Sequence, residues 1–231
     1  MINIQIENRN LVKLFEINGE GIYITESIVS TWVVMGILIG LALLVRSRLK
    51  SFKEVPSAFQ NVIEMMVEAI VNLGKSTLGD KLSFLSGYFF SVFAFILCSN
   101  YIGLVGLRPP TSDLATTLPL ALTTFGLIHF FGIKNRKGKY FKEYLQPFPV
   151  FLPFNILGEF AKPISLSFRL FGNILGGLII MELMYTMMPL LCRFILPDIG
   201  HIFFDVFVGA LQAFVFTMLS MTFISLKSAA D

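Results

Sequence analysis

The chain has 231 residues, of which 55% are hydrophobic and only 14% are charged. A soluble domain carries roughly a quarter of its residues as charged side chains, so this composition indicates an integral membrane protein. The net charge of +3 is too small to suggest nucleic-acid binding, and two histidines without an H-E-x-x-H motif do not suggest a zinc enzyme, so we expect neither a metal nor a cofactor.

The N-terminal segment, residues 1–27, is polar and mixed, and it lacks the charged start and apolar centre of a cleaved signal peptide. The first apolar span is predicted over residues 28–45. It is followed by a basic cluster between Arg46 and Lys53, and such clusters favour the cytoplasmic side of a membrane. We therefore expect residues 1–27 outside the cytoplasm and residues 28–231 to form a single membrane domain.

Residues 56–73 have a different pattern from a spanning segment. Their apolar side chains recur at helical spacing, while glutamine, asparagine and glutamate fill the opposite face. This pattern predicts an amphipathic helix that lies at or near the cytoplasmic face of the membrane rather than crossing it. Glu64 and Glu68 are most simply explained as the solvated side of that helix.

Two further spans are predicted over residues 82–104 and 114–133. A turn that contains Arg108 and two prolines separates them, and the second span ends in a basic cluster, residues 134–142. The positive-inside rule makes this second basic loop cytoplasmic as well, which agrees with the orientation derived from the first span.

The last two apolar segments, residues 149–190 and 198–225, are longer than a perpendicular span requires. The stretch between Pro163 and Pro189 alone would be ~40 Å long as one helix at ~1.5 Å per residue, against ~30 Å of hydrocarbon. We expect the two segments to form a long, strongly tilted hairpin, with the C-terminus in the cytoplasm. The predicted fold class is therefore an all-α membrane protein with five transmembrane helices and one interfacial amphipathic helix.

Arg169 is the only charged residue between Lys162 and Glu182. A guanidinium keeps its charge in proteins, and holding one in the middle of a membrane costs ~3 kcal/mol on insertion scales and ~10 kcal/mol or more in simulations. We therefore expect Arg169 to face a partner, a cavity or a neighbouring subunit rather than lipid. Ser165 and Asn173 lie one helical turn to either side and share its face.

The last predicted helix carries a second polar face. Its members at helical spacing are His201, Asp205, Gly209 and Gln212. If the two helices are antiparallel, Arg169 and Gln212 fall at similar depth and Asp205 lies nearer the outer side. This arrangement predicts a polar path from the outside to a fixed positive charge. The alternative is that Arg169 forms a purely structural ion pair with Asp205 or Glu159.

Two motifs resemble subunit a of the F-type ATP synthases, the membrane stator of a rotary motor. They are S-L-S-F-R-L-F-G-N-I-L-G-G at residues 165–177 and L-Q-A-F-V-F at residues 211–216. Shorter stretches match in the same order, namely S-N-Y-I-G (99–103), S-D-L-A-T-T-L (112–118), L-Q-P-F-P (145–149) and A-K-P (161–163). The resemblance extends from about residue 31 to the C-terminus.

By this resemblance Arg169 is the essential ion-translocation arginine of the family. Asn173 and Gln212 match polar neighbours of the channel, and Asn100 and Asp113 match polar positions of the outer access path. Asp113 is equally well explained as a cap at the N-terminus of the third span.

Two positions depart from the family pattern. Members often carry Glu or His nine residues after the arginine, where this chain has Leu178, and His or Glu seven residues before the glutamine, where it has Asp205. One carboxylate thus stands in place of a pair, and Glu182, one turn beyond Leu178, is an alternative second group. Glu159 is expected to line the inner exit of the ion path, the alternative being simple contact with solvent.

The resemblance implies a non-catalytic subunit with two aqueous half-channels, which couples the flow of protons or sodium ions to rotation and ATP synthesis. The implied partners are a rotor ring of small hairpin subunits bearing a mid-membrane Asp or Glu, the peripheral-stalk subunit b, the whole ATP synthase and the lipid bilayer. The implied location is the inner (plasma) membrane of a bacterium, with an organelle membrane as the alternative. A self-contained channel or transporter and a membrane enzyme are the competing classes. The sequence has neither the inverted repeat typical of many transporters nor a nucleophile–base pair at usable spacing.

Overall fold

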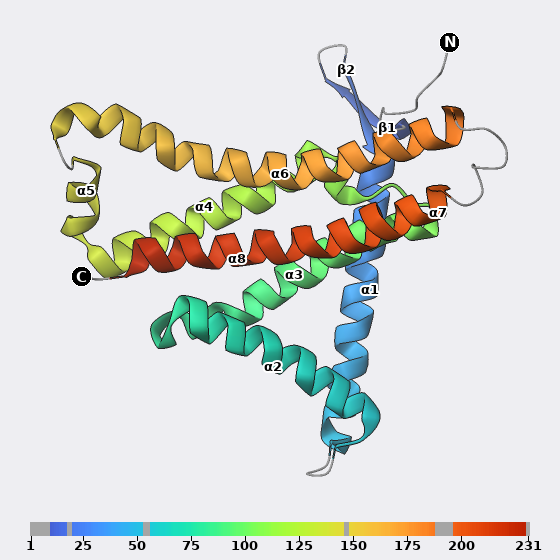
Figure 1. Ribbon diagram of the computed structural model, residues 1–231, viewed down its shortest axis with the longest axis horizontal. Coiled ribbons are helices and arrows are strands. Elements are labelled where there is room, and N and C mark those ends of the chain that lie inside the picture. Colours follow the sequence, from blue (N-terminus) through green and yellow to red (C-terminus); the bar gives the residue numbers. More distant parts are fainter. Residues whose placement is uncertain (1–9, 18–19, 53–55, 146–147, 188–195, 230–231) are drawn as a thin grey trace. The chain divides into compact units, whose positions relative to one another are not determined.

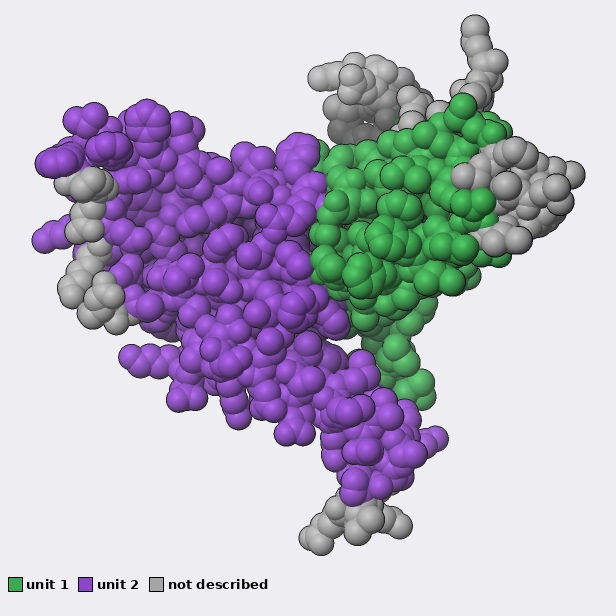
Figure 2. Space-filling view, in the orientation of Figure 1, with its two compact units in different colours: residues 1–44, 94–116, 170–213 green, residues 45–93, 117–169, 214–231 purple. Residues whose placement is uncertain are grey.

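The computed structural model describes residues 10–17, 20–52, 56–145, 148–187 and 196–229. The chain divides into two compact units, coloured green and purple in Figure 2. Unit 1 comprises residues 1–44, 94–116 and 170–213, and unit 2 comprises residues 45–93, 117–169 and 214–231. Each unit is built from several long helices and is described separately below.

Five helical segments in the described residues are long and apolar enough to cross a membrane, which confirms the predicted all-α membrane fold. They are Glu26–Arg48, Asp80–Val105, Leu114–Arg136, Pro149–Met187 and Leu196–Ser228. Their ends differ from the predicted ones by three residues at most. Residues 188–190 of the fourth predicted span lie outside the described residues.

The helices within these segments are, in chain order, α1 (Glu26–Arg48), α3 (Ser86–Tyr101), α4 (Leu114–Arg136), α6 (Leu152–Met187), α7 (Leu196–His201) and α8 (Gly209–Ser228). Shorter 3₁₀ turns flank α3 at Asp80–Leu85 and Ile102–Val105, and another, Pro149–Phe151, precedes α6. A turn at Pro110–Ser112 precedes α4, and a short helix, α5 (Gly138–Tyr144), follows it. One more element, η6 (Ile202–Val208), is a π-helix that joins α7 to α8.

Helix α6 is the longest element, with 36 residues, and it continues through Pro163 without a break (Figure 1). In unit 2 its first half lies against the second half of α8, where Lys227 forms an ion pair with Glu159. In unit 1 its second half lies against α7, where Tyr185 forms a hydrogen bond with His201. A second contact in each unit, Lys162 with the Phe223 ring in unit 2 and Gly177 with Phe204 in unit 1, shows that the two segments run antiparallel within each unit, as a hairpin requires. Their tilt in the membrane stays a prediction.

The predicted amphipathic helix is α2 (Ala58–Leu78), which extends five residues beyond the expected end. The Ser57 side chain accepts a hydrogen bond from the Gln60 backbone N–H and caps its start, and Gly79, at a φ of 70°, ends it. Positive φ is readily adopted by glycine because it has no Cβ. Helix α2 is not among the segments that qualify as spans, and its position at the membrane surface stays a prediction.

The core of unit 2 gathers apolar side chains from five elements. The buried members are Leu78 of α2, Leu82 and Leu85 of the turn before α3, Phe89 of α3, Ile128 and Phe131 of α4, and Met221 and Ile224 of α8. Burying each of these side chains contributes roughly 1.5–3 kcal/mol when the alternative is water. This core fixes the C-terminal end of α8 beside α4, close to the cavities described below.

An antiparallel β-hairpin precedes the first span, and the sequence analysis did not anticipate it. Strand β1 covers Asn10–Ile17 and strand β2 covers Glu20–Thr25. Both strands are rich in branched and aromatic residues, which favour a pleated surface. The hairpin lies within the segment predicted to be extracytoplasmic. Neither that location nor the assignment of residues 28–231 to one membrane domain is tested by the fold, and both stay predictions.

Candidate functional site

Arg169 lies on the outward face of α6 in unit 2, and its side chain is exposed. Ser165 is exposed on the same face, whereas Leu166 and Leu170 are only 3% and 1% exposed and pack on the other side of the helix. Within the described part of the chain, no ion pair or side-chain hydrogen bond joins Arg169 to another residue. Within unit 2 the structural pair with Glu159 is therefore not formed, and the guanidinium remains available to a partner.

A cavity of about 230 Å³ lies beside Arg169. It is lined by Gly158, Ala161, Lys162, Ser165, Leu166 and Arg169 of α6 and by Leu219 and Phe223 of α8. A water molecule occupies ~30 Å³ of liquid, so this cavity is large enough for several. The arginine thus has room for solvent on the side that faces α8.

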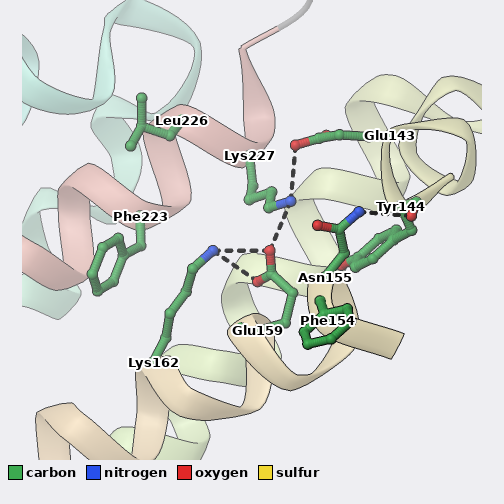
Figure 3. Close-up of a pocket in the computed structure, with 10 residues that line it drawn as sticks. Glu143, Tyr144, Phe154, Asn155, Glu159, Lys162, Phe223, Leu226 and Lys227 are labelled. Carbon is green, nitrogen blue, oxygen red and sulfur yellow. Dashed lines mark hydrogen bonds and ion pairs between the residues drawn. The ribbon is translucent and has the colours of Figure 1, made fainter. Parts of the chain in front are cut away.

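A larger cavity of about 500 Å³ shares Gly158, Lys162 and Phe223 with the first (Figure 3). Its remaining lining residues are Glu143, Tyr144, Phe154, Asn155, Glu159, Leu226 and Lys227. Four charged groups, two acidic and two basic, therefore line this cavity: Glu143 of α5, Glu159 and Lys162 of α6, and Lys227 of α8. Together the two cavities form a polar route along α6 within unit 2.

Glu159 and Lys227 form the centre of a chain of ion pairs in the larger cavity. The Lys227 ammonium lies 2.8 Å from Glu159 Oε1 and 2.9 Å from Glu143 Oε1, as the dashed lines in Figure 3 show. Lys162 donates to both oxygens of Glu159, at 2.9 and 2.8 Å. The other oxygen of Glu143 lies 2.6 Å from Arg136 Nη1. Charges of alternating sign thus connect α4, α5, α8 and α6.

Two tyrosines of α5 enclose this chain. The hydroxyls of Tyr140 and Tyr144 are 2.7 Å apart, and the Lys227 ammonium lies 4.9 Å from the centre of the Tyr144 ring. An ammonium over an aromatic face is attracted by the ring quadrupole. Burial raises the pKa of both tyrosine hydroxyls, so that neither ionises near neutral pH. The tyrosines therefore add hydrogen bonds and shielding from solvent, but no charge.

A second polar cluster lies in unit 1, around Asn100 of α3. Its amide donates to the Gly209 carbonyl at 2.8 Å and accepts from the Thr111 hydroxyl at 2.6 Å. Asn100 and Thr111 are both almost completely buried. Helix α8 begins at Gly209, where an added Cβ would lie 3.1 Å from Asn100 Cβ, so the close approach depends on glycine.

Asp205 lies near this cluster and belongs to a row of three groups. Its Oδ2 is 2.5 Å from Nδ1 of His201, and Nε2 of the same imidazole is 3.0 Å from the Tyr185 hydroxyl. Asp205 lies in the π-helix η6, and His201 directly precedes it. Short π-helical turns are frequent at functional sites. In the sequence, Asp205 stood in place of a pair of polar residues. In the structure its partner is His201, one helical turn earlier.

The remaining predicted residues lie in different environments. Asp113 accepts a hydrogen bond from the Ala115 backbone N–H at 3.0 Å, which is the capping geometry given above as the alternative to a channel role. Gln212 is 7% exposed, whereas Asn173 and Glu182 are exposed. Arg169 belongs to unit 2 and Gln212 to unit 1, so their common depth stays a prediction.

Sequence reasoning missed Lys227, Glu143 and Tyr185, and it placed His201 on the polar face of the last helix without identifying its partners. No local pattern marks them, because each acts through a partner on another element. The one sequence feature that could have drawn attention to Lys227 is its positive charge at the end of an apolar helix. Among the described residues, no group of three or more His, Cys, Asp or Glu side chains is placed to hold a metal ion.

Comparison with known proteins places these clusters in a family. Residues 28–225 match the family described as ATP synthase A chain. The chain is 38% identical over 199 residues to ATP synthase subunit a 1 of Syntrophotalea carbinolica, covering 84% of this chain and 82% of that one. It is 35% identical over 216 residues to ATP synthase subunit a of Moorella thermoacetica, covering 93% and 94% of the two chains.

The chain is also 31% identical over 210 residues to ATP synthase subunit a 2 of Acaryochloris marina, covering 90% of this chain and 87% of that one. These relatives are named as subunits of ATP synthase, and the described residues of this chain contain five helices that are long and apolar enough to cross a membrane. The match includes both α6, with its exposed arginine, and the polar segment from His201 to Gln212. The chain therefore belongs to the ATP synthase A chain family of multi-pass membrane proteins.

Proposed function

We propose that this chain is the ion-translocating stator of an F-type ATP synthase, and that Arg169 acts on a carboxylate of the rotor ring. The observation that carries this proposal is the exposed Arg169 guanidinium, which has no partner among the described residues and lies beside a cavity that continues to Glu159 and Lys227. A permanent cation in a spanning helix requires a partner. A carboxylate from another subunit meets that requirement.

The chemistry follows from the two environments that a rotor carboxyl group would meet. In hydrocarbon it keeps its proton, because burial disfavours the charged form, and beside a guanidinium the ionised form is favoured. The released proton then leaves through the cavities of unit 2, past Glu159, toward the inner side. An ion crossing ~100 mV supplies ~2.3 kcal/mol, so several ions must pass for each ATP made elsewhere in the complex.

The cluster in unit 1 serves the outer half-channel in this proposal. Asp205, His201 and Tyr185 form a row of groups that accept and donate protons, and Asn100 offers a fixed amide beside them. Histidine is suited to such a step because one nitrogen of the neutral imidazole donates a proton while the other accepts one. Asp113 and Gln212 are proposed as further polar groups of the same path, and Asn173 as a neighbour of the arginine.

Arg169 has a second task in this proposal, because its charge stands between the two half-channels. An ion cannot pass such a cation directly and must travel on the rotor instead. Lysine is a poor replacement, since it loses its proton readily when buried and has no planar fork for a carboxylate. The subunit itself makes no ATP and acts only with the ring, subunit b and the rest of the synthase.

The proposed setting is the inner membrane of a bacterium, with the N-terminus outside and the basic loops and C-terminus in the cytoplasm. The basic clusters after α1 and α4 support this orientation through the positive-inside rule. The relatives from Syntrophotalea carbinolica and Moorella thermoacetica support a bacterial source. The transported ion is a proton, or sodium where the ring binds it.

The test is Arg169→Ala in the whole complex, measured as ATP-driven ion pumping in inverted membrane vesicles. We expect pumping to be abolished and passive leak to rise, because the barrier between the half-channels is lost. Arg46→Ala, at an exposed arginine near the end of α1, removes the same charge and is expected to leave pumping intact. Unchanged pumping in Arg169→Ala, or selective flux through the purified chain alone, would refute the proposal.

A further inference from the structure

The inner end of the proposed ion path contains two lysines, of which Lys162 belongs to the A-K-P stretch given above and Lys227 to none of the motifs that carry the resemblance. Lys162 lines both cavities, and Lys227 lines the larger one. Both bond to Glu159, so the carboxylate at the junction of the cavities is held from two helices. Lys227 is the C-terminal member of this arrangement, four residues from the end of the chain.

Lys227 is held in place by more than one contact. Its side chain is 11% exposed and that of Glu159 is 10% exposed, so this is an enclosed pair rather than a surface one. Glu143 provides a second carboxylate at 2.9 Å, and the Tyr144 ring provides an aromatic face at 4.9 Å. An ion pair on an exposed lysine contributes little to stability and does little to fix the side chain. Lys227 is enclosed and contacts two carboxylates and an aromatic ring, so its position is well defined.

We propose that Lys227 is a positioning residue of the inner half-channel, which holds the Glu159 carboxylate at the junction of the two cavities and fastens it to α5 through Glu143. This inference rests on the proposed function of the chain. Through Lys227 the end of the C-terminal helix sets the electrostatic potential that an ion meets between Arg169 and the inner side. Glu143 acts in the opposite sense, because it adds a negative charge to the same cluster.

The groups that face Glu159 determine the sign of the expected effects. They are Lys162 on its own helix, Lys227 on α8, and Glu143, Tyr140 and Tyr144 on α5. A neighbouring cation opposes the arrival of a proton, and a neighbouring anion favours it. Removing Lys227 therefore eases proton uptake from the inner side, and removing Glu143 hinders it.

The experiment measures ATP-driven proton pumping by the whole complex in inverted vesicles, where the medium corresponds to the inner side. Pumping is recorded as a function of the pH of the medium for the wild type and for Lys227→Gln, Lys227→Arg and Glu143→Gln. We expect the pH of half-maximal pumping to rise in Lys227→Gln, to fall in Glu143→Gln and to stay in place in Lys227→Arg. Lys142→Gln, at an exposed lysine of α5, is the charge-matched control and is expected to follow the wild type.

The result that overturns the inference is a wild-type pH profile in Lys227→Gln, or shifts of Lys227→Gln and Glu143→Gln in the same direction. If Lys227→Gln does not assemble, Glu143→Gln decides, since it keeps both lysines, and an unshifted profile in that variant overturns the inference. These outcomes are separate from the proposed function. Pumping that depends on Arg169 but not on Lys227 keeps the stator role and removes only the role of the lysine.

Discussion

Glu159 of α6 and Lys227 of α8 form an ion pair of 2.8 Å in which each side chain is about nine-tenths buried. The two residues lie at opposite ends of the hairpin in sequence, yet they meet because the helices are antiparallel in unit 2. Breaking one side of a buried pair costs about 3–5 kcal/mol, since a charge is left without compensation. The pair therefore ties the C-terminal helix to the beginning of α6 next to the cavity that leads from Arg169.

The stability of this cluster can be tested with Glu159→Gln. The substitution leaves Lys162 without its carboxylate, while Lys227 retains Glu143. We therefore expect the free energy of unfolding to fall by about 3 kcal/mol, the low end of the range for a broken buried pair. Detergent-induced unfolding of the purified complex provides the measurement. Glu68→Gln, on the exposed face of α2, is the matched control, and an equally small change in both variants would show that the cluster contributes nothing.

The row Tyr185–His201–Asp205 makes a prediction for the outer side. In His201→Ala the carboxylate loses its proton-exchanging partner, and we expect ATP synthesis driven by an outer proton supply to fall on the order of 10²-fold, as for a general acid–base group. Asp198→Asn, at an exposed carboxylate of α7, is expected to have no effect. Wild-type synthesis rates in His201→Ala would show that the imidazole lies outside the path.

Tyr185→Phe provides a graded version of the same test. The hydroxyl donates or accepts a single neutral hydrogen bond, which contributes about 0.5–1.5 kcal/mol, so the rate should fall by about tenfold at most. The pair between His201 and Asp205 is kept in this variant. A larger loss than in His201→Ala would contradict the order of the row.

The fold is readable from the sequence where a local property determines it. A spanning helix needs about 20 consecutive apolar residues, and for this reason the limits of the spans within the described residues are predicted to within three residues. The exposed side of α6 is also a local property, because Ser165, Arg169 and Asn173 recur at helical spacing. A charge that lipid cannot tolerate indicates a partner even when the partner is another chain.

The ion-pair cluster could not be predicted in this way. Glu143 and Lys227 are 84 residues apart, and each lies where a loop or a helix end ordinarily meets solvent. Only the packing of α8 against α4 and α6 encloses Lys227, whereas the Glu143 side chain stays 38% exposed. The contacts of His201 could not be predicted for the same reason. Its partner Tyr185 lies on another helix, and the π-helix that follows His201 has no simple sequence signal.

The buried tyrosines of α5 predict how the protein responds to alkali. Burial raises the pKa of Tyr140 and Tyr144 above the ordinary value near 10. Below pH ~10 both the folded and the unfolded chain keep these protons, and above it only the unfolded chain releases them, so stability falls as the pH rises. We expect a late phase of tyrosinate absorbance that coincides with unfolding and is smaller in Tyr144→Phe. Complete titration before unfolding would contradict the burial of these hydroxyls.

The most direct measurement of the central claim asks which face of α6 meets the rotor. Ser165→Cys and Asn173→Cys place a thiol one turn to either side of Arg169, and Ile164→Cys places one on an exposed face away from it, each in a chain whose native Cys98 and Cys192 are replaced by serine. A second cysteine is introduced beside the mid-membrane carboxylate of the ring subunit. We predict disulfide formation with residues 165 and 173 and none with residue 164. Cross-linking of residue 164 alone would mean that Arg169 does not face the rotor.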